Sequence, residues 1–248
     1  MGQIAYFGST GEIVEAFSAS DAEWEAICTT PKGQLLMPRS KWPAVAKTSI
    51  RGLRFFSHHS GYPGKLPAPE SYVHTRLKIE VARTLRELGY AASVEVPGNT
   101  PGGEEWVADV LAINSDGNKV AFEIQFSSQH LSDFRARTDR YTESGVRVCW
   151  LMPEKPVVWR ITKALAYENM DYYKVHKTFI SDCEKIIPFA LSIKGKNDYP
   201  DPLPPIRFGR GQHMKRLTLV DALQGMMIGR PKWEMPDWKW EVSDTLNT

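Results

Sequence analysis

The chain has 248 residues, 42% of them hydrophobic and 24% charged, with a formal net charge of +2. This length and apolar content suffice for one main domain with a buried core and additions to it. No segment approaches ~18 consecutive apolar residues and the first residues lack a basic-then-apolar signal pattern, so we expect neither a membrane span nor export. The three cysteines, Cys28, Cys149 and Cys183, form no Cys-x-x-Cys pair, which is typical of the reducing cytoplasm.

The first part of the chain is basic and is predicted to form short strands and turns. No Asp or Glu occurs between Glu25 and Glu70, whereas seven lysines and arginines do, with aromatic residues among them. Such a run of positive charge attracts polyanions. Residues 1–66 are therefore expected to form a basic, β-rich module that contacts nucleic acid; the alternative is a solvated basic face over a small aromatic core. The expected contacts are Arg39, Lys41, Arg51, Arg54 and His58, the last of which has a purely structural role as its alternative.

A Pro- and Gly-rich link precedes a helix predicted over residues 69–88, which ends before Gly89. At about 100° per residue, the apolar residues of this helix form one stripe. Glu70 and His74 project into that stripe one turn apart, and Lys78 lies on its edge. These side chains therefore face the body of the protein, where a polar group needs a partner. Alternatively, Glu70 is a first-turn carboxylate on the helix dipole and His74 a hydrogen-bonded boundary residue.

The next elements are predicted in the order strand, strand, strand, helix, strand. The strands are rich in β-branched and aromatic residues and cover 91–96, 106–113, 119–126 and 146–152. A turn cluster over 114–118 joins two of them into a hairpin. The helix over 128–143 predicts a right-handed crossover that lays the last strand parallel to 119–126. Together with the first helix, this α-β-β-β-α-β order predicts an α/β fold with a mixed sheet flanked by helices.

The hairpin brings two carboxylates together. With its five-residue loop, positions whose numbers sum to 232 are paired, which sets Asp109 opposite Glu123 and leaves Gln125 on the same face. Directly opposite side chains have Cβ atoms ~5 Å apart, where like charges destabilise a sheet. A divalent cation between them would remove the repulsion and take the oxygen ligands that Mg²⁺ prefers. The alternative is a register shifted by one residue, with Asp109 at a sheet margin.

The last part of the chain has weaker patterns. A helix is expected near 161–169, residues 195–212 are Pro-rich and loop-like, and a short helix is predicted near 217–227. The Trp-rich tail that follows is expected to pack onto the domain instead of forming a binding site. The predicted organisation is thus a basic module over 1–66, a core over 67–155 and a C-terminal extension over 156–248.

These elements and their motifs resemble the PD-(D/E)XK nuclease fold, and more narrowly the competence CoiA-like family of that superfamily. Residues 70–78 resemble the family's E-S-x-x-H-x-x-x-K start, and 122–127 its I-E-I-Q-x-S signature. Weaker similarities are to an R-x-D-V-L-type strand (108–111), the R-x-x-x-Y helix (137–141), the apolar strand after it (148–151) and an F-A-H element (56–58). The resemblance covers 55–152 well and 1–54 loosely. No Pro precedes Asp109, and Gln125 stands where the superfamily usually has Lys.

The resemblance implies Mg²⁺- or Mn²⁺-dependent hydrolysis of phosphodiester bonds, with DNA favoured over RNA, in DNA uptake, recombination, processing or defence. Asp109, Glu123 and the Ile124 carbonyl would bind the metal, and Glu70 would complete its shell or hold a second ion. The other implied catalytic residues are Gln125, which would orient the attacking water, and His74 and Lys78, which would contact the phosphate or a metal-bound water.

Arg137 and Tyr141, one helical turn apart, would contact nucleic acid in the same cleft; Tyr141 alternatively belongs to the core. The rival interpretation from another class is a DNA-binding protein on a nuclease fold that no longer cuts. The sequence indicates no membrane partner and no particular oligomeric state.

Overall fold

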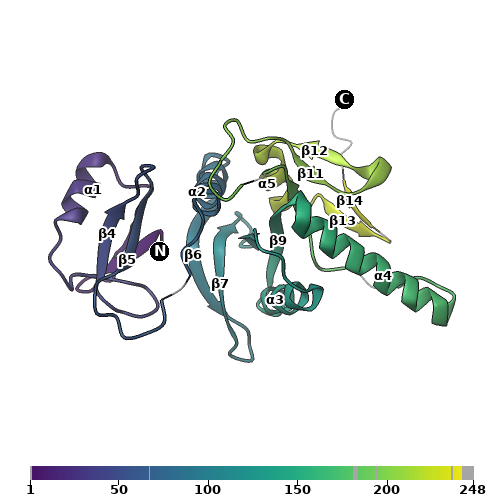
Figure 1. Cartoon of the computed structure of the whole chain (residues 1–248), viewed down its shortest axis with the longest axis horizontal. Coiled ribbons are helices and arrows are strands. Elements are labelled where there is room, and N and C mark those ends of the chain that lie inside the picture. Colours follow the sequence, from purple (N-terminus) through teal and green to yellow (C-terminus); the bar gives the residue numbers. More distant parts are fainter. Residues whose placement is uncertain (1, 67, 181–183, 194, 236, 242–248) are drawn as a thin grey trace. The chain divides into compact units, whose positions relative to one another are not determined.

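The computed structural model describes residues 2–66, 68–180, 184–193, 195–235 and 237–241. The chain forms two compact units, Met1–Glu70 and Ser71–Thr248, coloured purple to blue and blue to yellow in Figure 1. Each unit is described by itself. The boundaries expected from the sequence, 1–66, 67–155 and 156–248, stay a prediction.

The first unit consists of short strands and one helix around a small aromatic core. A three-stranded antiparallel sheet of order β2-β1-β3 accompanies the hairpin β4–β5. The elements are β1 (Ile4–Phe7), β2 (Ile13–Glu15), α1 (Asp21–Cys28), β3 (Leu35–Leu36), β4 (Ala44–Thr48) and β5 (Arg54–His58). Trp24 of α1 packs edge-on against the fully buried Phe56. The helix α1 was not predicted, although Ser20 and Glu23 form the capping box that begins it.

The second unit contains a seven-stranded mixed sheet of order β12-β11-β10-β9-β8-β7-β6. Its strands are β6 (Ala91–Asn99), β7 (Glu105–Ile113), β8 (Lys119–Ile124), β9 (Val146–Pro153), β10 (Pro188–Leu191), β11 (Ile206–Phe208) and β12 (Lys215–Leu217). The pairs β8–β9 and β9–β10 are parallel, and the other neighbours are antiparallel. Three strands from the last third of the chain thus extend the same sheet that the nuclease-like motifs occupy.

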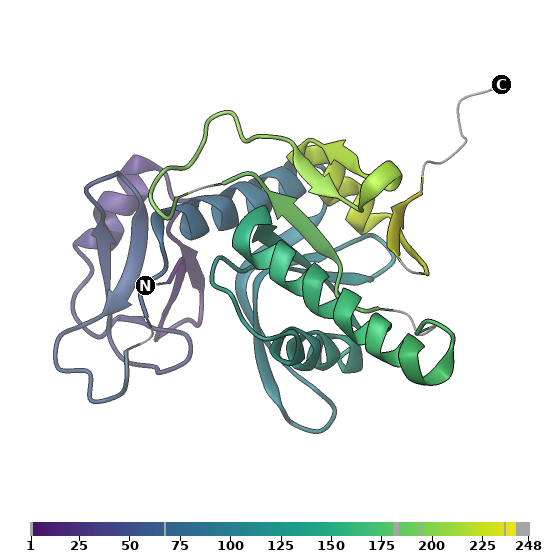
Figure 2. The same ribbon diagram turned by 45° about the vertical axis from the view of Figure 1, so that its right-hand side comes forward.

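Helices cover both faces of this sheet, with α2 and α5 on one side and α3 and α4 on the other (Figures 1 and 2). Their bounds are α2 (Tyr72–Glu87), α3 (Leu131–Glu143), α4 (Trp159–His176) and α5 (Leu219–Met227). A short turn, η1 (Glu154–Val158), leads from β9 into α4, and η2 (Gly211–His213) precedes β12. The expected α-β-β-β-α-β order of α2, β6, β7, β8, α3 and β9 is confirmed, as is the mixed sheet flanked by helices.

The register expected for the hairpin is also confirmed. Val110 pairs with Phe122 and Ile113 with Lys119, so paired positions sum to 232. The Asn114 side chain shapes the loop, because its Oδ1 accepts hydrogen bonds from the backbone N–H groups of Asp116 (3.0 Å) and Asn118 (2.8 Å). Regular pairing stops at Val110, one position short of the two carboxylates.

The Trp-rich tail packs onto the domain, as expected. It forms the hairpin of β13 (Pro231–Glu234) and β14 (Asp237–Trp240). The ring of Trp240 lies edge-on to Phe208, with ring centroids 5.2 Å apart, and the indole N–H of Trp238 donates to the carbonyl of Ile186 at 2.8 Å. Within the described residues, none of the helices has the length and apolar content that crossing a membrane requires.

Candidate metal and catalytic site

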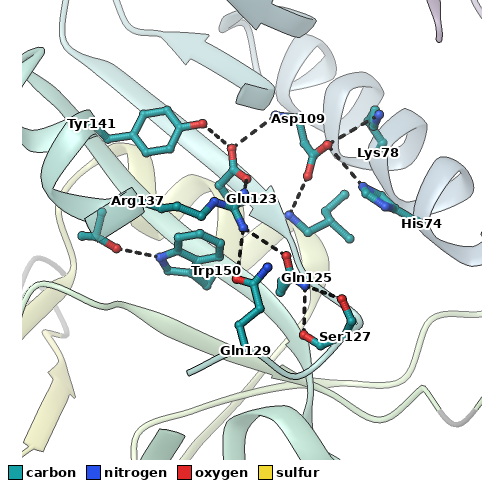
Figure 3. A network of polar contacts seen from close by, with 12 residues as sticks. His74, Lys78, Asp109, Glu123, Gln125, Ser127, Gln129, Arg137, Tyr141 and Trp150 are labelled. Atoms are coloured by element: carbon teal, nitrogen blue, oxygen red, sulfur yellow. Dashed lines mark hydrogen bonds and ion pairs between the residues drawn. The ribbon is translucent and has the colours of Figure 1, made fainter. Parts of the chain in front are cut away.

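Four elements of the second unit bring polar side chains to the point where β7 and β8 stop pairing (Figure 3). The first two turns of α2 supply a histidine and a lysine, β7 and β8 supply the two carboxylates, and α3 supplies an arginine and a tyrosine. The residues are His74, Lys78, Asp109, Glu123, Arg137 and Tyr141. The capped start of α2 matters here, because Ser71 accepts the His74 backbone N–H and so fixes the first turn that aims His74 inward.

Asp109 is held by three partners. Its Oδ1 lies 3.2 Å from His74 Nε2 and 3.5 Å from Lys78 Nζ, and its Oδ2 accepts the backbone N–H of Ile124 at 2.9 Å. Burial alone would raise the pKa of this carboxyl, but the Lys78 charge, His74 and the Ile124 N–H together hold the pKa well below its usual range. Asp109 is therefore ionised at neutral pH, as a metal ligand must be.

Glu123 is held differently, although it lies beside Asp109. Only 1% of it is exposed. One oxygen lies 2.6 Å from Arg137 Nη2, and the other accepts the Tyr141 hydroxyl and, at 3.4 Å, the Asp109 backbone N–H. Burial and the neighbouring Asp109 charge raise the pKa of Glu123 to about 7, against the opposing effects of Arg137 and Tyr141. At neutral pH, Asp109 is thus ionised, whereas Glu123 is close to the midpoint between its protonated and ionised forms.

Lys78 is fully buried and joins a third carboxylate to the pair. Its Nζ lies 3.2 Å from Glu95 on β6 as well as 3.5 Å from Asp109. Val94 and Val96 pair with β7 on either side of Asp109, so Glu95, Asp109 and Glu123 occupy adjacent strands. The backbone of Glu95 is left-handed, with φ of 55°, a conformation that non-glycine residues rarely adopt outside special sites.

Sequence reasoning missed Glu95, because the loop between β6 and β7 left their register open. In the sequence, Glu95 is a single carboxylate in a predicted strand, and this alone does not indicate which residue it faces.

A possible metal-ligating group is formed by Glu70, His74 and Asp109. One ligand atom from each lies within 4.8 Å of the other two. Glu70 stands directly before Ser71, so its position is linked to the start of α2. Two carboxylates suit Mg²⁺ or Mn²⁺, and an imidazole is a common ligand of transition metals. These donors fit the metal expected from the sequence. They include His74, which was expected to contact the phosphate or a metal-bound water and not to bind the metal itself.

Glu123 and Ile124 were also expected to bind the metal. The carboxylate of Glu123 is adjacent to Asp109, but Arg137 and Tyr141 occupy its oxygens. Ile124 contacts the site through its N–H, which holds Asp109. Their roles as ligands stay predictions.

Gln125 follows β8 and is tied to Arg137. Its Nε2 donates to the carbonyl (2.9 Å) and hydroxyl (2.7 Å) oxygens of Ser127, and its Oε1 accepts from Arg137 Nη1 at 3.1 Å. Arg137 also lies over the Trp150 ring, 4.6 Å from its centroid. One guanidinium therefore connects Glu123, Gln125 and the core, while part of its side chain, 31%, stays exposed.

The residues expected to contact nucleic acid fall into different environments. Tyr141 is 2% exposed and its hydroxyl donates to Glu123. Nucleic acid cannot reach its buried ring, so the structure favours the alternative in which Tyr141 belongs to the core. Arg54 pairs with Asp21, donates to the Ala19 carbonyl at 2.7 Å and supports the fold of the first unit. His58 lies 2.9 Å from Ser40 Oγ and stacks on Tyr62.

Arg39, Lys41 and Arg51 are exposed on the first unit. Of the residues selected in the basic module, these three are exposed, whereas Arg54 and His58 are partly buried.

Opposed carboxylates at the point where β7 and β8 stop pairing, within an α-β-β-β-α-β core, define a nuclease-like domain with the PD-(D/E)XK type of fold. The model of the family described as competence protein CoiA, nuclease-like domain, matches residues 70–192 of the chain. The matched segment contains the carboxylate pair and the four side chains first described around it, His74, Lys78, Arg137 and Tyr141.

No curated protein matches the chain. Among solved structures, the crystal structure of a repair endonuclease from Pyrococcus abyssi is similar over 42% of this chain and 46% of its own, with 21% identity and a TM-score of 0.27. The chain thus spans less than half the length of that endonuclease.

Proposed function

We propose that this protein is a divalent-metal-dependent nuclease that hydrolyses phosphodiester bonds in DNA, in uptake, recombination, processing or defence. The observation that carries the proposal is the placement of an ionised Asp109 beside Glu123, with Glu70 and His74 offering further ligand atoms within 4.8 Å. The family match supports nuclease chemistry for this segment. Mg²⁺ and Mn²⁺ are the ions that this donor set suits.

Asp109, Glu70 and His74 would hold the ion, with Glu123 and the Ile124 carbonyl at its other side. A divalent cation there lowers the pKa of a bound water and neutralises charge on the scissile phosphate. Lys78 is buried between Asp109 and Glu95, so it keeps Asp109 ionised and oriented and does not reach the substrate. Arg137 is the partly exposed cation of the site and would contact the phosphate.

Gln125 would orient the attacking water. A carbonyl oxygen has two lone pairs, and Arg137 takes one of them on Gln125 Oε1. The second can accept a hydrogen from water. The two bonds from Nε2 to Ser127 keep the amide from turning, which is the preorganisation that positioning a nucleophile requires.

The test is single-turnover cleavage of end-labelled single- and double-stranded DNA and RNA in Mg²⁺, Mn²⁺ or EDTA. Wild type should cut DNA with either metal and not in EDTA, and Asp109→Asn should be slower by ~10²-fold or more. Asp116→Asn is the matched control, because it removes an exposed carboxylate in the turn of the same hairpin. This variant should cut like wild type. Cleavage in EDTA, or an active Asp109→Asn protein, would contradict the proposal.

The second candidate is a DNA-binding protein that has kept the nuclease fold without cutting. Two observations favour it: Gln125 stands where the fold usually has a lysine, and Arg137 and Tyr141 already occupy Glu123. If wild type binds DNA but cuts no nucleic acid in either metal, this candidate replaces the first.

A further inference from the structure

A row of exposed aromatic and basic side chains runs along α4, opposite the helix side that buries Ile161. At about 100° per residue, the members of this row fall within a sector about 80° wide. Trp159 is 57% exposed and Tyr167 59% exposed, although large aromatic residues usually bury most of their surface. We call this row the α4 stripe; its residues are Trp159, Lys163, Tyr167, Met170 and Lys174.

The surroundings of the α4 stripe are positively charged. Residues 155–177 contain five lysines and arginines and two acidic residues. One of the acidic residues, Glu168, faces away from the stripe and pairs with Arg135 of α3 at 3.0 Å. The other, Asp171, pairs with Lys174 at 2.8 Å, but both side chains are about 70% exposed, where such pairs contribute little. The stripe therefore attracts anions.

Lysines also lie next to both rings. Lys155 Nζ is 4.1 Å from the ring centroid of Trp159, and Lys163 Nζ is 5.5 Å from that of Tyr167. Exposed contacts of this kind are weak, so each ammonium can exchange a ring face for a phosphate oxygen. An aromatic face next to a mobile cation is the pairing that proteins use for unpaired bases and their phosphates.

We propose that the α4 stripe binds single-stranded nucleic acid, with bases stacked on Trp159 and Tyr167 and phosphates on Lys163 and its neighbouring lysines. This inference rests on the proposed function, since it deepens the choice of substrate. A duplex keeps its bases stacked on one another and would offer only phosphates to this surface, so the two rings would contribute nothing to its binding. The rings are eight residues apart, which is ~12 Å along a helix, and can therefore hold separate bases.

The position of α4 in the fold supports this assignment. Strands β8 and β9 are parallel, so their carboxyl ends meet at one edge of the sheet. Gln125 lies at that edge, where its N–H donates to the Leu151 carbonyl at 3.0 Å. From the same edge the chain passes through η1 into α4, whose first residue is Trp159, and Figures 1 and 2 show α4 continuing outward from the sheet. The stripe thus begins at the edge that carries the candidate catalytic residues.

The experiment measures binding in EDTA, so that cleavage plays no part. Fluorescence anisotropy would follow a labelled thymidine oligonucleotide and a labelled duplex against the full-length protein. Trp159→Ala combined with Tyr167→Ala should weaken binding to the single strand about tenfold or more, with less than about a twofold change for the duplex. Lys163→Ala combined with Lys174→Ala should reduce the salt slope for the single strand by about 1.4.

Tyr172→Ala is the matched control, because Tyr172 is an exposed aromatic residue on the opposite side of α4; it should bind like wild type. Trp159→Phe and Tyr167→Phe keep a stacking surface and should retain affinity within about threefold. Unchanged circular dichroism and melting would show that all variants fold.

Three results would overturn the assignment: no binding of the single strand by wild type, equal losses for single strand and duplex, or light scattering that shows the stripe to be a self-association face. The two proposals can fail separately. If the α4 stripe binds single strands but the protein cuts nothing in Mn²⁺, only the nuclease proposal is contradicted. If the protein cuts DNA and the stripe variants bind single strands like wild type, only the present proposal is contradicted.

Discussion

Two carboxylates with the same chemistry have different protonation in this site, and their partners explain the difference. Asp109 has a lysine, a histidine and a backbone N–H around it, so its charge is compensated. Glu123 is buried more deeply and lies next to that charge, and Arg137 compensates it only in part. An ion bound here would act on Glu123 most, since it would replace a proton that Glu123 holds near neutral pH.

The raised pKa of Glu123 predicts a pH dependence of stability without metal. The folded protein keeps a proton on Glu123 up to pH about 7, whereas the unfolded chain releases it near 4.5. Between these values the unfolded state binds fewer protons, so the free energy of unfolding falls as pH rises, by ~3 kcal/mol. Asp109 does not contribute in this window, because its lowered pKa acts below 3.8.

Urea unfolding of wild type and Glu123→Gln in EDTA, at pH 5 and pH 8, measures this effect. From pH 5 to pH 8 the free energy of unfolding of wild type should fall relative to that of Glu123→Gln, because glutamine does not titrate. Parallel pH profiles would mean that Glu123 is ionised throughout and that its environment has been misjudged.

At the scale of elements, local patterns were predictable and distant pairings were not. The β7–β8 hairpin and its register follow from two patterned strands and one short loop, which together span the 20 residues 105–124. The strands β10, β11 and β12 are four, three and three residues long, too short for a pattern, and they form only against partners far along the chain. The helix α4 extends beyond the predicted 161–169 to His176. Its second half buries little, so it lacks the apolar stripe from which a helix is predicted.

The same distinction applies to the candidate site. His74 and Lys78 follow from the stripe of one helix, and Asp109, Glu123 and Gln125 from one hairpin, so their convergence could be foreseen. Glu95 could not, because its place beside Asp109 depends on the β6–β7 register and a left-handed backbone. The burial of Tyr141 depends on how α3 packs over β9 and β7, which its spacing from Arg137 does not determine.

The loop of the β7–β8 hairpin provides a test at this scale. Asn114→Ala removes the acceptor of two loop N–H groups and should lower the free energy of unfolding by about 1 kcal/mol. Ser115→Ala, in the same exposed loop, should change it by less than ~0.5 kcal/mol. Chemical denaturation compares the two. If both variants unfold like wild type, Asn114 does not shape this turn.

At the scale of the whole molecule, the first unit is expected to supply nonspecific affinity for nucleic acid. Its exposed cations Arg39, Lys41 and Arg51 can contact phosphates, which carry no sequence information. Replacing all three by Ala should weaken duplex binding to a similar extent for different sequences and flatten the salt dependence by about 0.9 for each lost contact. Anisotropy titrations between 50 and 200 mM salt, roughly the range over which such contacts weaken most, measure the slope.

Arg54→Lys is the contrasting variant in that series. Because Arg54 holds Asp21 and the Ala19 carbonyl, it should lower the melting temperature and leave the salt slope unchanged. A triple variant with an unaltered slope would show that this face is only solvated.

The most direct test of the central claim is the effect of Mn²⁺ on thermal stability, because it needs no knowledge of the substrate. An ion that binds only the folded state stabilises it by ~2.7 kcal/mol at a hundred times its dissociation constant, which raises the melting temperature by several degrees. Wild type and the control Asp116→Asn should show this shift in full, and Asp109→Asn should lose it. Equal shifts in wild type and Asp109→Asn would contradict the account, because the ion would then bind elsewhere.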